Sequence, residues 1–188
     1  ASSVSQIVTY AKANAGKLRY GSAGIGSANH LAGEMFKHAA GIDMLHVPYK
    51  GNGPAIIDLI SGQISLMLGS ISSLYPHAAA KKLRVVAVAS PKRAAAAPEV
   101  QTFAESGMPG FHVSGWNGMV APRGTPTGIV RRLNAEIVAA FSQPDVLERL
   151  RKQSIDSATG APEQFAAHMK SEFARYDKLI KAVNLKVE

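Results

Sequence analysis

The first half of the chain alternates short apolar runs with amphipathic stretches, and this alternation limits the fold more than any other feature. Apolar residues three or four positions apart predict helices, and short β-branched or otherwise apolar runs predict strands. Buried strands that alternate with helices are typical of an α/β layer with a mostly parallel sheet. The expected strands cover 18–20, 44–47, 64–68 and 83–89. The expected helices cover about 3–14, where Ser3 and Gln6 form a capping box, a stretch after the loop at 20–27 that ends near 40 with Gly41 as its stop, 54–60, and a short stretch up to 81.

The second half lacks this alternation. A basic, alanine-rich connector at 90–97 precedes one or two expected helical turns at 98–106 and an extended segment at 111–120. Helices are then expected from Thr125, as cap, with Pro126 at the first position, from Pro144, and from Pro162. We therefore divide the chain into 1–89 and 90–188.

Composition narrows the functional classes only slightly. Lysine and arginine number 21 against 13 aspartates and glutamates, which gives a formal charge of +8. The basic residues are scattered and do not alternate with aromatic side chains, so an anionic small molecule is a better expectation than nucleic acid. The absence of cysteine excludes disulfides and thiol catalysis. No apolar run approaches the roughly 18 residues needed to span a membrane, and no signal peptide remains, which fits a mature exported protein as well as a cytoplasmic one.

The loop after Tyr20 is the strongest candidate for a binding site. Strand, small-residue loop and helix together form an arrangement that can hold an anion, because glycines permit close approach and the first helical amides lack partners. Ser22 and Ser27 add hydroxyl groups, although Ser27 is equally suited to cap the helix, and an ordinary turn is the alternative interpretation. Further small-residue loops follow Val47 and Leu68, and loops at the carboxyl ends of parallel strands are where such sheets bind ligands.

The sequence contains no recognisable catalytic set. No histidine pair has metal-ligand spacing, so neither a metal nor a cofactor is expected. His30 is a capping or packing residue more readily than a base, and Lys50 is equally a carboxylate partner or an exposed loop lysine. The glycine-rich loop has neither the lysine and hydroxyl residue of a phosphate-binding loop nor the third glycine of a dinucleotide site. An α/β enzyme or nucleotide-binding domain that uses this loop as a phosphate site stays as the alternative.

Several motifs together resemble the Bug (TctC-like) family, the extracytoplasmic solute-binding receptors of tripartite tricarboxylate transporters. The resemblance extends over essentially the whole chain, in order and at the expected spacing. The motifs are YGSAGIGSANHLAGE at 20–34, HVPYKG at 46–51, GQI at 62–64, KLRVVAV at 82–88, GWNGMVAP at 115–122 and PEQF at 162–165.

The resemblance implies a periplasmic receptor with the Venus-flytrap fold, which clamps a small carboxylate between two lobes without catalysis and passes it to membrane transporter subunits. The ligand would be a di- or tricarboxylate, an acidic amino acid or an aromatic acid. Residues 1–89 would form a nearly complete second lobe, and 90–188 the crossover and part of the first lobe. The ligand-binding residues implied are Ser22, Ala23, Gly24, Gly26, Ser27, His30, Lys50, Gly51, Ser70 and Trp116.

Two departures from the family qualify this expectation. The strand that ends at Leu68 is followed by Gly69 and Ser70, where family members usually have a polar or acidic residue with asparagine, so the preference of that loop for a ligand is open. The chain is also shorter than the family's receptors, and the first lobe's own ligand loop is not in it. We expect the segment at 111–120 to have an unpaired edge, which would favour a dimer or strand exchange.

Overall fold

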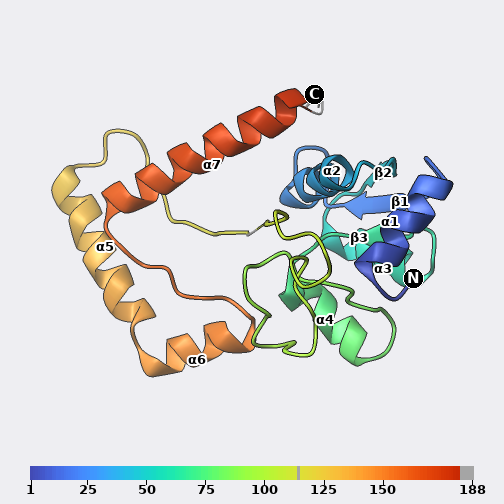
Figure 1. The fold of residues 1–188 in the computed structure, drawn as a ribbon. Coiled ribbons are helices and arrows are strands. Elements are labelled where there is room, and N and C mark those ends of the chain that lie inside the picture. Colours follow the sequence, from blue (N-terminus) through green and yellow to red (C-terminus); the bar gives the residue numbers. More distant parts are fainter. Residues whose placement is uncertain (114, 183–188) are drawn as a thin grey trace. The chain divides into compact units, whose positions relative to one another are not determined.

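The computed structural model describes residues 1–113 and 115–182, and it divides into two compact units (Figure 1). The N-terminal unit contains Ala1–Gly115, and the C-terminal unit begins at Trp116. The predicted division at residue 89 concerns the lobes of a two-lobed receptor and stays a prediction.

A three-stranded parallel sheet lies at the centre of the N-terminal unit (Figure 1). β1 (Arg19–Ser22) is the middle strand, and it pairs with β2 (Leu45–Pro48) on one side and with β3 (Leu66–Met67) on the other. The register places Tyr20 beside both His46 and Leu66. The predicted α/β layer with a parallel sheet is therefore confirmed.

Four helices belong to this unit: α1 (Val4–Ala13), α2 (Ala28–Ala40), α3 (Asn52–Ile60) and α4 (Ile71–Ala79). Their ends follow the predicted capping chemistry. The Ser3 hydroxyl accepts the backbone N–H of Gln6 at 3.2 Å, and Gly41 ends α2 in the left-handed conformation with φ of 59°. The Gln6 side chain accepts the N–H of Ser2 rather than that of Ser3, so the expected capping box is shifted by one residue.

Two glycines bring α2 and α3 close to the sheet. A methyl group at Gly33 of α2 would overlap the ring of Tyr20, and one at Gly21 of β1 would overlap Ile64 and approach Ala55 of α3. Successive side chains of a strand point to opposite faces. Tyr20 therefore faces α2 and the Gly21 position faces α3, so the two helices cover opposite faces of the sheet.

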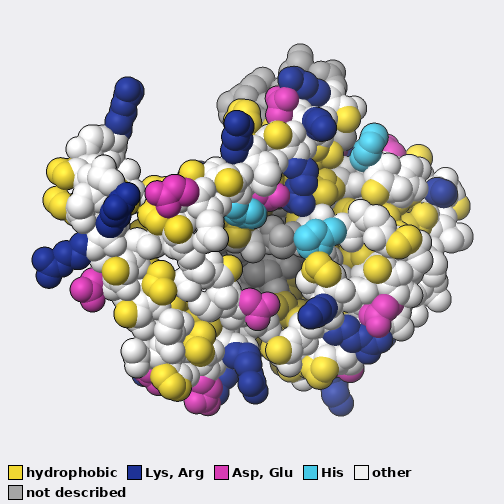
Figure 2. All heavy atoms as spheres, turned by 60° about the vertical axis from the view of Figure 1, so that its left-hand side comes forward, with side chains coloured by type: hydrophobic (Ala, Val, Ile, Leu, Met, Phe, Trp, Pro, Cys, Tyr) yellow, Lys and Arg dark blue, Asp and Glu magenta, His cyan; other side chains and the backbone are white. Residues whose placement is uncertain are grey.

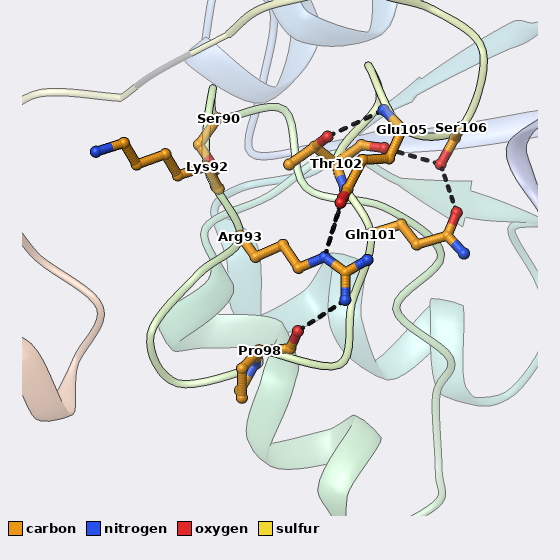
Figure 3. Close-up of polar contacts among 8 residues, drawn as sticks. All are labelled: Ser90, Lys92, Arg93, Pro98, Gln101, Thr102, Glu105 and Ser106. Carbon is orange, nitrogen blue, oxygen red and sulfur yellow. Dashed lines mark hydrogen bonds and ion pairs between the residues drawn. The ribbon is translucent and has the colours of Figure 1, made fainter.

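The core of this unit extends into the segment that follows the alternating region. Phe36 of α2 packs edge-on against Phe103 and Phe111, with ring centroids 5.7 and 5.9 Å away. In the same segment Arg93 pairs with Glu105 at 3.0 Å and donates to the carbonyl of Pro98 (Figure 3). The buried aromatic packing therefore holds the segment at 90–111 against α2, while the exposed ion pair joins two parts of that segment to each other.

Two local predictions were wrong. Residues 83–89 form no strand in the described chain: Val86, Ala87 and Ala89 pack on the core, while the backbone bonds are those of the bridge between Val88 and Thr102, from Val113 N–H to Ala89 and from Leu83 N–H to His77. The apolar side chains of this run thus pack on the core, although its backbone does not pair as a strand of the sheet. Residues 98–106 form turns that include one helical bond, from the N–H of Ser106 to the carbonyl of Thr102, and the described residues of the predicted extended segment at 111–120 belong to no helix or sheet. The cap of the next helix is Pro126, because the Thr125 hydroxyl donates to the carbonyl of Pro122.

The C-terminal unit contains α5 (Thr127–Phe141), α6 (Pro144–Lys152) and α7 (Pro162–Ala182), all three helices without a buried residue. Trp116 packs edge-on against Phe165 and His168 of α7, with centroids 5.5 and 5.3 Å away. Many large apolar side chains of this unit remain exposed: Met119, Val120, Ile129, Leu133, Leu147 and Phe173. No helix in the described ranges is both long and apolar enough to cross a membrane.

Replacing Gly33 with alanine tests the contact between α2 and β1. We expect Gly33→Ala to destabilise the N-terminal unit by about 1–3 kcal/mol, since the methyl group must displace a packed aromatic ring. Urea unfolding followed by far-ultraviolet circular dichroism measures this effect, because the single tryptophan, Trp116, lies in the other unit. Gly53→Ala is the matched control: a methyl group there meets no atom within 4 Å, and alanine is the better helix former. Equal effects of the two changes would contradict the packing argument.

Candidate anion-binding site

Three loops meet at one edge of the sheet. The first loop (23–27) follows β1, the second loop (49–51) follows β2 and the third loop (68–70) follows β3. Because the three strands are parallel, their carboxyl ends and the loops after them share an edge. The topology therefore places the three predicted small-residue loops together.

Hydrogen bonds join the first loop to the other two. The N–H groups of Tyr49 and Gly51 donate to the carbonyls of Ser22 and Ala23 at 3.0 and 3.1 Å. The side-chain amide of Asn29, in the first turn of α2, donates to the carbonyl of Leu68 at 2.6 Å. These bonds fix the second and third loops relative to the start of α2.

The first loop is held in shape by its own serines and glycines. Gly24 and Gly26 have φ of 135° and 73°, which side chains other than glycine rarely adopt. Ser27 is the N-cap of α2: its hydroxyl accepts the N–H of His30 at 3.3 Å and donates to the carbonyl of Gly24 at 2.7 Å. The structure thus gives Ser27 the capping role that the sequence left open.

The remaining amides of this region are available to a ligand. The backbone N–H groups of Ala23, Ile25, Ala28 and Asn29 have no acceptor among the described residues, whereas those of Gly24, Gly26 and Ser27 are bonded within the region. The amides of Ala28 and Asn29 lie at the positive end of the α2 dipole. Four unpaired donors beside a helix N-terminus are suited to bind an anion.

The second and third loops add polar groups at the same edge. Gly51, with φ of 108°, is the N-cap of α3, and the side chain of Lys50 is exposed beside it. The side-chain oxygen of Asn52 is buried and has no hydrogen-bond partner in the structure. Ser70 is the exposed N-cap of α4, and its hydroxyl lies 2.8 Å from that of Ser73. A cation and a hydroxyl group therefore flank the four amides.

Three stacked rings lie at the base of the first loop. The imidazole rings of His30 and His46 are nearly parallel, with centroids 3.8 Å apart and an interplanar angle of 7°, and Tyr20 stacks on His46 at 4.9 Å. The Tyr20 hydroxyl donates to Glu34 at 2.6 Å, and Glu34 also pairs with Lys37 at 3.0 Å. We call these three rings the ring stack.

Burial changes the proton affinities within the ring stack. Desolvation lowers the pKa of His30, and it lowers the pKa of His46 to about 4, with the neighbouring His30 acting in the same direction. Desolvation and the bond to Glu34 raise the pKa of Tyr20. Both histidines are therefore neutral at pH 7.

The structure gathers nine of the ten predicted ligand-binding residues around the three loops, while Trp116 belongs to the C-terminal unit. Contact of each with a ligand stays a prediction. Ser22 is fully buried, and its hydroxyl is bonded to Gly24 and His46. His30 is also buried, and its ring faces His46. Both side chains face the protein interior in this structure.

Sequence reasoning missed the free amides of Ile25, Ala28 and Asn29, the bond from Asn29 to Leu68, and His46. The first-turn position of Ala28 and Asn29 was a usable signal for unpaired amides. His46 lies two residues after the buried Met44, and side chains two residues apart along a strand point to the same face. Its partner, however, depends on the register between β1 and β2, which the local sequence does not specify.

The sequence model of the tripartite tricarboxylate transporter family receptors matches residues 1–185. The chain belongs to this receptor family. Among its curated relatives is a UPF0065 protein from the tcbD–tcbE intergenic region of a Pseudomonas species, 44% identical over 178 residues, which are 94% of this chain and 53% of the relative. The family consists of solute-binding receptors, which are not enzymes.

Solved receptor structures match the fold closely. The structure of an R. palustris protein with adipate has a TM-score of 0.92 at 33% identity, covering 98% of this chain and 62% of that one. The periplasmic binding protein BugD has a TM-score of 0.89 at 33% identity, with coverages of 100% and 64%. MatC from Rhodopseudomonas palustris with bound malate has a TM-score of 0.83 at 31% identity, with coverages of 95% and 62%. These matches confirm the predicted periplasmic-binding-protein fold, for part of a receptor.

The chain spans about half the length of most of the curated relatives that it matches. What a complete receptor binds, and which subunits it meets, is therefore treated below as a proposal.

Replacing Asn29 tests the connection between the first and third loops. We expect Asn29→Ala to lower stability by about 1 kcal/mol, the net value of one hydrogen bond, and to increase amide hydrogen exchange at Ser73 and Leu74, whose bonds end on Ser70. Ser72→Ala is the control, because the exposed Ser72 hydroxyl makes only a 3.3 Å bond to Ser70. Unchanged exchange in Asn29→Ala would show that the third loop is held by other contacts.

Proposed function

We propose that this chain carries the carboxylate-binding loops of a periplasmic solute-binding receptor, which delivers its ligand to the membrane subunits of a tripartite tricarboxylate transporter. The observation that carries the proposal is the group of four unpaired amides in the first loop and the first turn of α2. No catalytic step is part of the proposal.

A carboxylate suits these donors because its two oxygens accept several hydrogen bonds while its charge is stabilised by the helix dipole. We assign direct contact to the backbone of the first loop and of the first turn of α2, with Lys50, Gly51 and Ser70 at the rim. We assign Ser22 and His30 to holding the loop. Trp116 stays a proposed ligand contact supported by the family resemblance alone.

The related structures support a dicarboxylate as the first choice. Adipate and malate, the molecules named in two related structures, both carry two carboxylates separated by a short chain. One carboxylate would bind the four amides, and the other would reach Lys50 or donors from a second lobe. A tricarboxylate, an acidic amino acid or an aromatic acid remains within the same proposal.

Association with further polypeptide is a separate part of the proposal. The exposed apolar side chains of α5 and α7, such as Ile129, Leu133 and Phe173, support packing against another protein surface. A second copy of this chain, by dimerisation or strand exchange, is one such surface, and size-exclusion chromatography with light scattering distinguishes a dimer from a monomer.

Direct titration tests the carboxylate proposal. We expect adipate or malate to shift the amide resonances of Ala23, Ile25, Ala28 and Asn29 in ¹H–¹⁵N spectra, whereas the uncharged adipamide should not, since the donors require an anion. ATP tests the phosphate-site alternative in the same way. Shifts caused by ATP but not by either dicarboxylate would overturn the proposal.

Lys50 provides a second, independent readout. Lys50→Ala should weaken binding about tenfold if its ammonium group contacts a carboxylate, as expected for one charge-assisted bond. Lys17→Ala is the matched control, because Lys17 is also exposed but precedes β1 and so belongs to the opposite edge of the sheet. Equal weakening in both variants would indicate a non-specific effect of net charge.

The scattered arrangement of basic side chains supports the choice of Lys50 for this test. On the face drawn in Figure 2, lysine and arginine side chains are distributed over the surface, with acidic and apolar side chains between them. A local contact of Lys50 is therefore a better expectation than a field from one large basic patch.

A further inference from the structure

The imidazole rings of His30 and His46 are bonded to the backbone and side chain that shape the first loop. The N–H of Gly26 donates to Nδ1 of His30 at 3.0 Å, and Nε2 of His46 lies 2.7 Å from the hydroxyl of Ser22. Gly26 is near the centre of the loop and Ser22 is the last residue of β1. The two rings therefore hold the loop at both of these points.

The bond to Gly26 requires one protonation state of His30. A backbone N–H can only donate, so Nδ1 must carry a lone pair and the ring proton must be on Nε2. A second proton on His30 would occupy Nδ1 and point at the Gly26 N–H. Protonation of His30 and this bond are therefore mutually exclusive.

The bond to Ser22 belongs to a small closed network. The Ser22 hydroxyl lies 3.0 Å from the carbonyl of Gly24, to which it donates, and it accepts the N–H of Gly24 at 3.1 Å. His46 then completes the network by donating from Nε2 to the Ser22 oxygen. Because Ser22 is fully buried, loss of this donor would not be replaced easily by water.

The charged surroundings oppose a proton on either ring. The groups that face the pair are each other's ring, 3.8 Å away, the neutral Tyr20 of β1, and Glu34 with Lys37 on α2. Glu34 attracts a proton, but it already accepts the Tyr20 hydroxyl and pairs with Lys37. Two stacked imidazolium rings would repel each other at this distance.

We propose that His30 and His46 are positioning residues for the first loop, and that the loop keeps its anion-binding shape only while the ring of His30 is uncharged. This inference rests on the proposed function and deepens it. A loosened loop would no longer align the four free amides. Acid would thus open the binding loop before the whole chain unfolds. The lowered pKa of His30 agrees with this assignment and places the change below pH 6.5.

Side-chain replacements separate positioning from packing. In His30→Asn the amide oxygen takes the place of Nδ1 and still accepts the Gly26 N–H, but it cannot be protonated. In His30→Phe the ring and its stacking remain, while the acceptor is lost. His46→Gln and His46→Phe form the corresponding pair, since a glutamine side-chain N–H can replace the donor at Nε2. His38→Asn is the control: His38 lies on the same helix, but its side chain is exposed.

The experiment measures amide hydrogen exchange of Gly24 and Gly26 in the ligand-free chain at pH 7 and pH 4.5, as protection factors corrected for intrinsic rates. In the unaltered chain we expect the protection of Gly26 to fall about fivefold or more at pH 4.5, the value of one lost hydrogen bond, while protection within β1 persists. His30→Asn should keep protection of Gly26 at both pH values, and His30→Phe should lack it at both. His46→Gln and His46→Phe should behave in the same way for Gly24, and His38→Asn should match the unaltered chain.

Two results would overturn the proposal. If His30→Phe keeps protection of Gly26 while His30→Asn loses it, the ring acts by packing alone. If protection of the loop in the unaltered chain is the same at pH 4.5 and pH 7, protonation does not control the loop. Because no ligand is present, failure of this test leaves the dicarboxylate titration unaffected, and failure of that titration leaves this result standing.

Discussion

The packing of Tyr20 on α2 is the interaction on which the rest of the N-terminal unit depends. Tyr20 is fully buried in the middle strand, its ring fits against the bare backbone of Gly33, and its hydroxyl donates to the buried Glu34. A side chain at residue 33 would force the helix away from the sheet. The close approach brings the first turn of α2 over the end of β1, and so brings His30 onto the ring of His46.

As a result of this contact, the polar groups of the site fall into two sets. Side chains such as Ser22, Ser27 and His30 satisfy one another and the loop backbone, whereas the donors left unpaired are backbone N–H groups. Backbone donors anchored in this way need little reorganisation when a ligand arrives. A receptor gains affinity when such ordering is complete before binding. In the proposed function, the buried side chains therefore contribute to recognition through the shape of the loop.

The alternation of apolar runs predicted the parallel sheet, and local capping signals at Ser3 and Gly41 predicted helix ends, because each depends on neighbouring residues. The partner of His46 could not be predicted in this way, since it is set by the register of two strands separated by a helix. The run at 83–89 failed for a related reason. An apolar segment is stabilised equally by hydrogen bonds to a neighbouring strand or by packing of its side chains, and only the tertiary structure decides between the two.

The stacked histidines also bear on how loop order and global stability are coupled. In the unfolded chain both imidazoles take up protons near pH 6.5, whereas in the folded chain they bind them only at lower pH. Between these values the unfolded state binds more protons, so stability rises with pH through this window and falls on acidification. The same protons that disfavour folding would release Gly26 first, since its bond is the one that protonation of His30 removes. Local opening of the binding loop is therefore the lower-energy response to acid, and unfolding of the sheet is the higher one.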